Sequence, residues 1–250
     1  MTGRVLITGA GRGIGLSIAR VLARDGFSLA LVTKSESSAT RLRAERFVVD
    51  ADAIVVAFDL ADDAALADFV TKWREPLWGI VHNAGICATA TLADCEHDPW
   101  REVLAVNLEA PYRLMRGLLP SLARPGRIVT IGSQLSVEGR AGYGAYCASK
   151  FGLIGLTKCW AKELGREGVT VNAVCPGWVD TEMTGNDVAR IAAEMGRDAA
   201  SFKAEIADPL ELKRFNTPEE VAELVAFLMS DKSSGITGRA WLMQTIWNQQ

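Results

Sequence analysis

Short β-rich apolar runs alternate with helical patterns along almost the whole chain, and this alternation restricts the possible folds more than any other feature. Strands are expected at 4–8, 28–33, 53–58, 77–82, 127–131, 170–175 and 240–243. Helices are expected at 14–25, near 37–46, at 62–73, at 99–123 with a break around Asn107, and at 145–165. Strands separated by helices require crossover connections, which produce a parallel sheet covered on both faces. The pattern therefore predicts an α/β protein with a doubly wound sheet, in a single domain over residues 1–250 because no linker divides it.

Composition excludes several classes of protein. The chain is 49% hydrophobic and 23% charged, which is typical of a soluble globular protein. Its net charge is -3, from 27 basic and 30 acidic residues, so no nucleic-acid partner is expected. Apolar runs such as 53–58 are far shorter than the roughly 20 residues of a spanning helix, so no membrane segment is expected. The five scattered cysteines form no Cys-x-x-Cys pair, which predicts no metal site and free thiols in the cytoplasm.

The stretch 180–216 breaks the rhythm and is expected to form one or two short helices joined by loops. It follows the sixth strand, so it is placed over the carboxyl ends of the strands, where such sheets bind ligands. A surface insertion is the plain alternative. The position favours a substrate-binding lid.

A glycine-rich run lies between the first strand and the first helix. Residues 8–15 read TGAGRGIG, which fits T-G-x-x-x-G-x-G but not G-x-G-x-x-G, because Ile14 occupies the place of the third glycine. Glycines let the backbone approach a pyrophosphate, and the following helix N-terminus offers N–H groups and a positive dipole end. A tight turn is the alternative, and a P-loop is excluded because no Gly-Lys-Ser/Thr follows. The run predicts a dinucleotide site.

A tyrosine and a lysine follow four residues apart, at Tyr146 and Lys150. On a helix these positions share one face, so an ammonium would lie beside a phenol. A phenol with an ordinary pKa of about 10 is a poor base at neutral pH, and a nearby cation favours the phenolate. By itself the pair is equally explained as a surface contact on a helix.

With these motifs the chain resembles the short-chain dehydrogenase/reductase family over nearly its whole length. The glycine run is similar to the nucleotide loop of that family, and Asn83-Ala84-Gly85 to its Asn-Ala-Gly element. The family's catalytic tetrad is matched by Asn107, Ser133, Tyr146 and Lys150, with Ser133 thirteen residues before Tyr146. Pro176-Gly177, followed by Val179 and Thr181, resembles the loop on the nicotinamide side in that family. Ile236-Thr237-Gly238 resembles the element before the last strand of the family.

The resemblance implies a role for each member of the tetrad. Tyr146 would give a proton to the developing alkoxide, and Ser133 would donate a hydrogen bond to the same oxygen. Lys150 would lower the pKa of Tyr146 and bind the nicotinamide ribose, while Asn107 would hold a water that connects Lys150 to solvent. Tyr143 competes for the acid role, but it has no lysine four residues on.

The cofactor prediction is NADP, with NAD as the alternative. The end of the second strand carries Thr33 where NAD enzymes usually carry an acidic residue, and Lys34 and Arg12 could both reach a 2'-phosphate. The residues expected to bind the cofactor are Gly9, Gly11, Arg12, Gly13, Ile14, Gly15, Lys34, Asp59, Leu60, Asn83, Ala84, Gly85, Tyr146, Lys150, Pro176, Gly177, Val179 and Thr181. The residues expected to contact the substrate are Ser133, Gln134, Tyr143, Tyr146, Trp178 and Met183, with Phe202 and Trp247 as further candidates for the pocket wall.

Some positions depart from the family pattern. His82 stands where an asparagine often precedes Asn-Ala-Gly, and we interpret it as structural; His97 is expected on the surface. The run MQTIW at 243–247 replaces a common Asp-Gly-Gly, which leaves the details of assembly open.

These features predict an NADP-preferring carbonyl reductase or alcohol dehydrogenase, which resembles 3-oxoacyl-thioester reductases through the segment 210–229. One alternative is an NAD-linked dehydrogenase of a secondary alcohol, sugar or hydroaromatic diol. A second is a non-catalytic nucleotide-binding regulator on the same fold. The apolar residues on more than one face of helices 111–123 and 145–165 predict a homotetramer, with a dimer as the lesser alternative.

Overall fold

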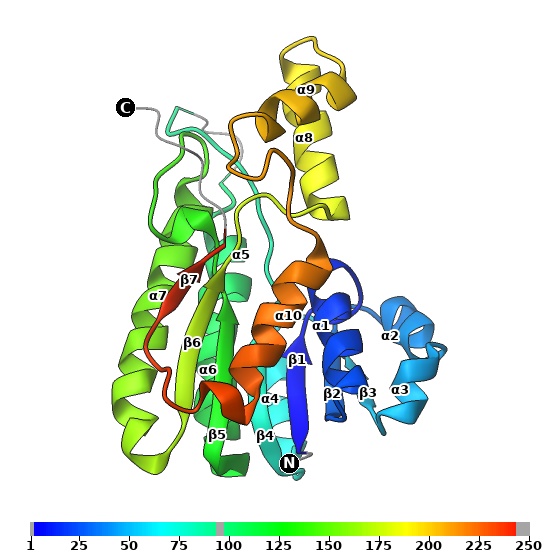
Figure 1. Ribbon diagram of the computed structural model, residues 1–250, viewed down its shortest axis with the longest axis vertical. Helices are drawn as coiled ribbons and strands as arrows, with labels where there is room; N and C mark the ends of the chain where they lie inside the picture. Colours follow the sequence, from blue (N-terminus) through cyan, green and yellow to red (C-terminus); the bar gives the residue numbers. More distant parts are fainter. Residues whose placement is uncertain (1–2, 94–97, 244–250) are drawn as a thin grey trace.

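Parallel strands form a single sheet at the centre of the molecule (Figure 1). The computed structural model describes residues 3–93 and 98–243, and seven strands lie in these ranges in the order β3-β2-β1-β4-β5-β6-β7. Their bounds are β1 Arg4–Thr8, β2 Ser28–Thr33, β3 Ile54–Ala57, β4 Leu77–His82, β5 Leu122–Ile131, β6 Thr170–Cys175 and β7 Ala240–Leu242. Each neighbouring pair is parallel, which confirms the predicted doubly wound, Rossmann-type sheet.

The helices connect the strands and cover the sheet on both faces (Figure 1). Their bounds are α1 Gly13–Arg24, α2 Glu36–Arg43, α3 Arg46–Asp50, α4 Asp63–Lys72, α5 Trp100–Leu104, α6 Ala110–Leu118, α7 Gly144–Leu164, α8 Glu182–Glu194, α9 Ala199–Ala207 and α10 Pro218–Met229. None of the helices within the described ranges combines the length and the apolar character needed to cross a membrane.

The core has two layers because successive residues of a strand point to opposite faces. Val5 packs with α1 and α10 through residues such as Ile18 and Val225. The next residue, Leu6, packs on the other face, with Leu114 of α6 and Leu164 of α7. Alternation along one buried strand therefore supplies both hydrophobic layers.

Two helix boundaries differ from the expectation. The helix expected at 99–123 is broken as predicted, because α5 and α6 are separated by a π-helical turn at Ala105–Glu109 that contains Asn107. It ends at Leu118 rather than at Ala123, which lies in β5. Pro120 cannot continue a helical hydrogen-bond ladder, so a short 3₁₀ turn at Leu119–Ser121 leads into the strand instead.

Other helices were not part of the predicted pattern. The segment expected near 37–46 forms α2, and a separate short helix α3 follows it. The pattern also did not predict α10, although Thr217 and Glu220 form a reciprocal capping box with Pro218 in the first turn.

Helices α8 and α9 stand apart from the sheet, beyond the carboxyl ends of its strands (Figure 1). They are the short helices expected within 180–216. Val188, Ala192, Phe202, Leu210 and Phe215 give them a small core of their own. This arrangement makes the pair a compact unit above the sheet.

Candidate active site

Two cavities lie at the carboxyl edge of the sheet, next to the point where the strand order reverses between β1 and β4. One has a volume of about 840 Å³ and includes the glycine-rich loop. We call it the cofactor cavity. The other, of about 1270 Å³, lies between that edge and α8, and we call it the substrate cavity. Ser133 and Tyr146 line both cavities, so the two spaces meet at these side chains.

The glycine-rich loop leaves backbone N–H groups available to an anion. Gly9 and Gly13 have φ angles of +68° and +53°, a region that favours glycine. Arg12 precedes the first turn of α1 but gives it no side-chain cap, and that turn holds no acidic residue. The N–H groups and the positive end of the helix dipole therefore face the cofactor cavity, where the nearby carboxylate of Glu182 is paired with Arg12. This arrangement fits a pyrophosphate.

Asn83 ties the end of β4 to the loop after β1. Its side-chain Nδ2 donates to the carbonyl oxygens of Thr8 and Gly9 at 2.9 and 3.2 Å. The hydroxyl oxygen of Thr8 accepts from the backbone N–H groups of Asn83 and Ala84 at 3.1 and 3.0 Å. A side chain at Gly15 would meet the Gly9 carbonyl oxygen at 2.2 Å, so only glycine lets α1 approach this closely. These contacts give the cofactor cavity a rigid floor.

The cations predicted to bind a 2'-phosphate are paired with carboxylates. Lys34 Nζ lies 3.1 Å from Asp59, and Arg12 lies 2.9 Å from Glu182. A third cation, Arg41 of α2, also lines the cofactor cavity, and its guanidinium donates to the hydroxyl of Ser38 at 3.1 Å. Arg41 could not be predicted from the sequence, because it lies on a helix whose orientation only the fold decides.

All the residues predicted to bind the cofactor line this one cavity, from Gly9 through to Thr181. They come from the loops after β1, β2, β3, β4 and β6, from the first turn of α1 and from α7. The fold thus brings the predicted set together, and cofactor binding by these residues remains a prediction.

Lys150 is a buried cation next to the catalytic tyrosine position. Its side chain is 3% exposed, and Nζ donates to the carbonyl oxygen of Ile131 at 2.8 Å. Nζ also lies 5.6 Å from the centroid of the Tyr146 ring. Burial lowers the pKa of Lys150 to about 8, because removal from water disfavours the charged form.

The pKa of Tyr146 is set mainly by burial. Burial, the largest influence, raises the pKa of Tyr146 above its ordinary value, although a hydrogen bond with Ser133 acts to lower it. Removal from water disfavours the phenolate. The phenol therefore keeps its proton at neutral pH, as a proton donor requires. The lowering of the Tyr146 pKa by Lys150 remains a prediction.

Asn107 lies behind the cavities rather than in them. It is fully buried, and its Oδ1 accepts from the N–H of Ile86 at 2.8 Å. Its Nδ2 donates to the carbonyl oxygen of Ile86 at 2.9 Å and to the hydroxyl of Ser149 at 3.1 Å. Both amide hydrogens are thus used by protein groups. Asn107 holds the chain after β4 against α7, and the water relay predicted for it remains a prediction.

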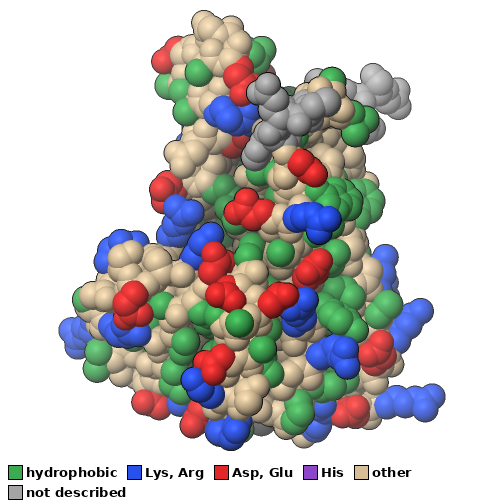
Figure 2. All heavy atoms as spheres, turned by 180° about the vertical axis from the view of Figure 1, so that it is seen from behind, with side chains coloured by type: hydrophobic (Ala, Val, Ile, Leu, Met, Phe, Trp, Pro, Cys, Tyr) green, Lys and Arg blue, Asp and Glu red, His purple; other side chains and the backbone are tan. Residues whose placement is uncertain are grey.

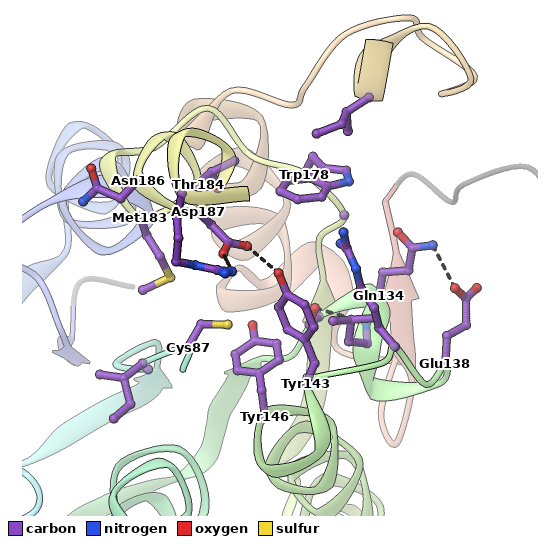
Figure 3. A pocket seen from close by; sticks show the side chains of 18 of the residues that line it. Cys87, Gln134, Glu138, Tyr143, Tyr146, Trp178, Met183, Thr184, Asn186 and Asp187 are labelled. Carbon is purple, nitrogen blue, oxygen red and sulfur yellow. Dashed lines mark hydrogen bonds and ion pairs between the residues drawn. The ribbon is translucent and has the colours of Figure 1, made fainter. Parts of the chain in front are cut away.

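All six residues predicted to contact the substrate line the substrate cavity, and Figure 3 shows five of them by name: Gln134, Tyr143, Tyr146, Trp178 and Met183. The sixth is Ser133.

The two tyrosines, Tyr143 and Tyr146, differ in the partners of their hydroxyl groups. The Tyr143 hydroxyl donates to Asp187 at 2.7 Å, whereas Tyr146 is in contact with Ser133. Burial and Asp187 raise the pKa of Tyr143. A hydroxyl already engaged with a carboxylate is a poor donor to a substrate.

Other sequence expectations have mixed outcomes. Phe202, a candidate for the pocket wall, packs in the small core of α8 and α9 and does not line the substrate cavity, so it is a core residue. His82 is 2% exposed, lies 5.9 Å from the Trp160 ring and lines neither cavity. His97 and Trp247 fall outside the described residues.

The substrate cavity also contains residues that the sequence analysis missed. These are Cys87, Glu138, Arg140, Asp187 and Arg190, among others. They come from distant loops and from α8, and none belongs to a motif. Burial raises the pKa of the Cys87 thiol to about 11, so this cysteine is a neutral wall residue at neutral pH. Within the described ranges, no group of three His, Cys, Asp or Glu side chains is placed to hold a metal ion.

Comparison with known proteins shows similarity over nearly the full chain. A family model described as enoyl-(acyl carrier protein) reductase matches residues 9–244. An uncharacterized oxidoreductase of Bacillus subtilis, YxjF, is 36% identical over 94% of this chain and 94% of its own. The 3-oxoacyl-[acyl-carrier-protein] reductase FabG of Pseudomonas aeruginosa is 35% identical over 93% of this chain and 92% of its own.

A solved structure is similar in three dimensions as well. A variant of the actinorhodin polyketide ketoreductase, crystallised with NADPH, has a TM-score of 0.87 and 30% sequence identity, and the match covers 97% of this chain and 95% of the other. The predicted enzyme class, an oxidoreductase, is confirmed by these relatives. With the glycine loop, the Asn-Ala-Gly element and the tetrad in place on the fold, this chain belongs to the short-chain dehydrogenase/reductase family.

Proposed function

We propose that this enzyme reduces a ketone to a secondary alcohol with NADPH, and that Tyr146 is the proton donor. The observation that carries the proposal is the meeting of the two cavities at Ser133 and Tyr146. A carbonyl group at this junction would lie beside both hydroxyls and next to the space for the cofactor. Hydride and proton can then reach one carbonyl from two directions.

When bound, the dinucleotide supplies the hydride. Tyr146 gives its proton to the carbonyl oxygen as negative charge develops there, and Ser133 donates a hydrogen bond to the same oxygen. Lys150 stabilises the resulting phenolate by its charge. Because the pKa of Lys150 is about 8, its ammonium can also return a proton to Tyr146 near neutral pH. Asn107 acts through its contacts with Ile86 and Ser149, which hold the wall of the site in place.

NADP is the proposed cofactor because cationic side chains line the cavity where the 2'-phosphate would bind. The end of β2 carries Thr33 rather than a carboxylate, and Lys34 and Arg41 line the cavity there. The NADPH in the related ketoreductase structure supports the same choice. The pairing of Lys34 with Asp59 is the one observation that favours the NAD-linked alternative, because this lysine is partly neutralised.

A 3-oxoacyl thioester is the proposed substrate. The similarity to the Pseudomonas aeruginosa 3-oxoacyl reductase supports it, and the substrate cavity of about 1270 Å³ is large enough for an acyl chain. Residues 180–216 act as the lid in this proposal. Met183 and Thr184, in the first turn of α8, line both cavities, so a movement of α8 would close the two spaces together.

We also propose a homotetramer in the cytoplasm. Exposed apolar side chains on α5, α6 and α7 support the assembly, and they include Trp100, Tyr112 and Phe151. The cysteines within the described ranges are all free thiols, which suits a reducing compartment.

The test measures the oxidation of NADPH and of NADH by the purified protein, read from the loss of nicotinamide absorbance. The substrates are a 3-oxoacyl N-acetylcysteamine thioester and a set of simple ketones. We expect NADPH-dependent reduction that Tyr146→Phe removes. Turnover with NADH alone would favour the NAD-linked dehydrogenase. Cofactor binding without turnover of any carbonyl or alcohol would favour the non-catalytic regulator.

A further inference from the structure

One guanidinium in the lining of the substrate cavity, that of Arg140, has no ion pair with any carboxylate in residues 3–93 and 98–243. The other two cations in its lining are neutralised. Arg190 contacts Asp187 and Glu194 at 2.6 and 2.7 Å, and Arg12 contacts Glu182 at 2.9 Å. Arg140, by contrast, forms no ion pair with any carboxylate of the described ranges.

The carboxylates of this cavity are also already engaged. Asp187 is held by Arg190 and by the Tyr143 hydroxyl. Glu205 pairs with Arg197. Glu138 accepts a hydrogen bond from Gln134 Nε2 at 3.0 Å. Among the described carboxylates of the lining, Glu138 is therefore the one without a cation partner, and no ion pair joins it to Arg140.

Two aromatic rings hold the Arg140 guanidinium in place. Its central carbon lies 4.9 Å from the centroid of the Tyr143 ring and 5.3 Å from that of the Trp178 ring. Contacts of this kind attract a cation to the face of a ring. A guanidinium that rests on rings by its faces keeps its N–H donors in its own plane, where they can bind an oxyanion in bidentate fashion.

Both rings are themselves fixed. The Tyr143 hydroxyl donates to Asp187 at 2.7 Å, as Figure 3 shows, and Asp187 is fixed by Arg190. The Trp178 ring is stacked on Phe215, with centroids 5.4 Å apart and planes at 15°. The position of Arg140 is therefore organised before any ligand arrives, which lowers the entropic cost of binding one.

We propose that Arg140 binds an anionic group of the substrate, a carboxylate or a phosphate, so that the natural substrate is an anionic ketone. The inference rests on the proposed function and specifies its substrate class. Tyr143 precedes Tyr146 by three residues at the start of α7, and both side chains line the same cavity (Figure 3). One substrate molecule can therefore place its oxyanion at Arg140 and its carbonyl group at Tyr146. The two sources of that chemistry are the free carboxylate of an oxo acid and the phosphate of a phosphopantetheine arm.

The test uses two matched substrate pairs with NADPH. The first pair is an oxo acid and its methyl ester, with the chain length between ketone and carboxylate varied. The second pair is a 3-oxoacyl thioester of phosphopantetheine and the same acyl group on N-acetylcysteamine, which lacks the phosphate. The enzymes are the wild type, Arg140→Gln, Arg140→Lys and the control Arg166→Gln, which removes an exposed arginine that lies outside both cavities.

We expect the wild type to prefer the anionic member of at least one pair. Arg140→Gln should lower kcat/KM for that member about ten- to hundredfold and leave the neutral member within about threefold, because one charge-assisted contact is lost. Arg140→Lys should recover part of the preference. Arg166→Gln should leave both members of each pair nearly unchanged. The pair that responds identifies whether the oxyanion is a carboxylate or a phosphate.

An equal response of both members to Arg140→Gln in both pairs would overturn the inference while the proposed function stands. Calorimetric titration of the wild type and Arg140→Gln with the same compounds, in the presence of NADP⁺, reads binding without turnover. If no carbonyl is reduced, the proposed function fails, and the titration still decides the inference: loss of binding of only the anionic members in Arg140→Gln supports it, and unchanged binding refutes it.

Discussion

At the scale of single residues, two tyrosines three positions apart have different environments. Tyr146 lies at the junction of the two cavities with Ser133 and near Lys150, while the Tyr143 hydroxyl is bound to Asp187. Burial raises the pKa of both phenols, so both keep their protons at neutral pH. The partner of each hydroxyl, rather than its acidity, distinguishes the donor.

Replacing Tyr146 by phenylalanine should lower kcat by about 10³-fold or more, because the proton donor and one hydrogen bond to the developing alkoxide are lost at a single atom. Steady-state kinetics with NADPH measure the effect, and fluorescence titration checks that cofactor binding is intact. Tyr143→Phe is the matched control and should cost much less. A Tyr146→Phe enzyme that keeps more than about a tenth of wild-type turnover would exclude Tyr146 as the acid.

Replacing Lys34 by glutamate should raise the KM for NADPH about ten- to hundredfold and change that for NADH much less, since one charge-assisted phosphate contact is lost. The contact with Asp59 at 3.1 Å does not prevent this, because both side chains are partly exposed and the lysine can turn to a phosphate. Arg43→Glu is the control, since Arg43 pairs with Glu36 and lies outside the cofactor cavity. An NADPH/NADH ratio unchanged by Lys34→Glu would show that Lys34 is a solvated loop charge.

At the scale of elements, the end of β4 and helix α7 meet at a buried histidine. The His82 ring lies 5.9 Å from the Trp160 ring, and neither ring nitrogen has a hydrogen-bond partner in the described part of the structure. Burial lowers the pKa of His82 to about 3. The packing of α7 on the sheet therefore depends on a neutral imidazole.

The free energy of unfolding should fall as the pH falls from about 6.5 towards 3. In the unfolded chain His82 takes up a proton near its ordinary pKa of 6.5, whereas in the folded protein it stays neutral until about pH 3. At pH 5 this linkage amounts to about 2 kcal/mol relative to neutral pH. Urea denaturation at a series of pH values compares the wild type with His82→Leu, which should lose this part of the slope. Identical slopes in the two proteins would show that the ring is accessible to protons in the folded state.

At the scale of the whole molecule, charge and apolar surface have different distributions. On the face that Figure 2 shows, basic and acidic side chains are interspersed rather than gathered into one basic patch, in accord with a net charge of -3. Apolar side chains remain exposed on the helices beside the site, among them Tyr112 of α6 and Phe151 of α7, which are 43% and 46% exposed. A second subunit would cover these side chains.

Light scattering at micromolar concentration should give the mass of a tetramer, because the exposed apolar side chains of α6 and α7 gain free energy when covered. Phe151→Glu should shift the mass towards dimers or monomers, since a carboxylate would be buried at the contact. Lys158→Gln, on the same helix, changes the charge by the same amount and is the comparison. A monomeric mass for the wild type would refute the assembly.

The sequence by itself determined the parts of this protein that depend on local pattern. Alternating apolar runs predicted the strands, because a buried parallel strand needs a continuous apolar run whatever surrounds it. The glycine run at 8–15 predicted the cofactor loop, and the spacing of Tyr146 and Lys150 predicted an ammonium near a phenol, since close backbone approach and i, i+4 proximity are properties of short segments. The role of that phenol was implied by the family resemblance.

Only the tertiary structure decided which distant side chains meet and how water is excluded. Arg41, Arg140 and Asp187 belong to no motif, and the fold brings them to the cavities from α2, the loop after β5, and α8. The raised pKa of Tyr146 was likewise not predictable from the spacing to Lys150, because desolvation depends on every atom packed around the phenol. Spacing along a chain specifies which residues are local neighbours. The burial of a side chain and the charge around it depend on atoms from every part of the folded chain.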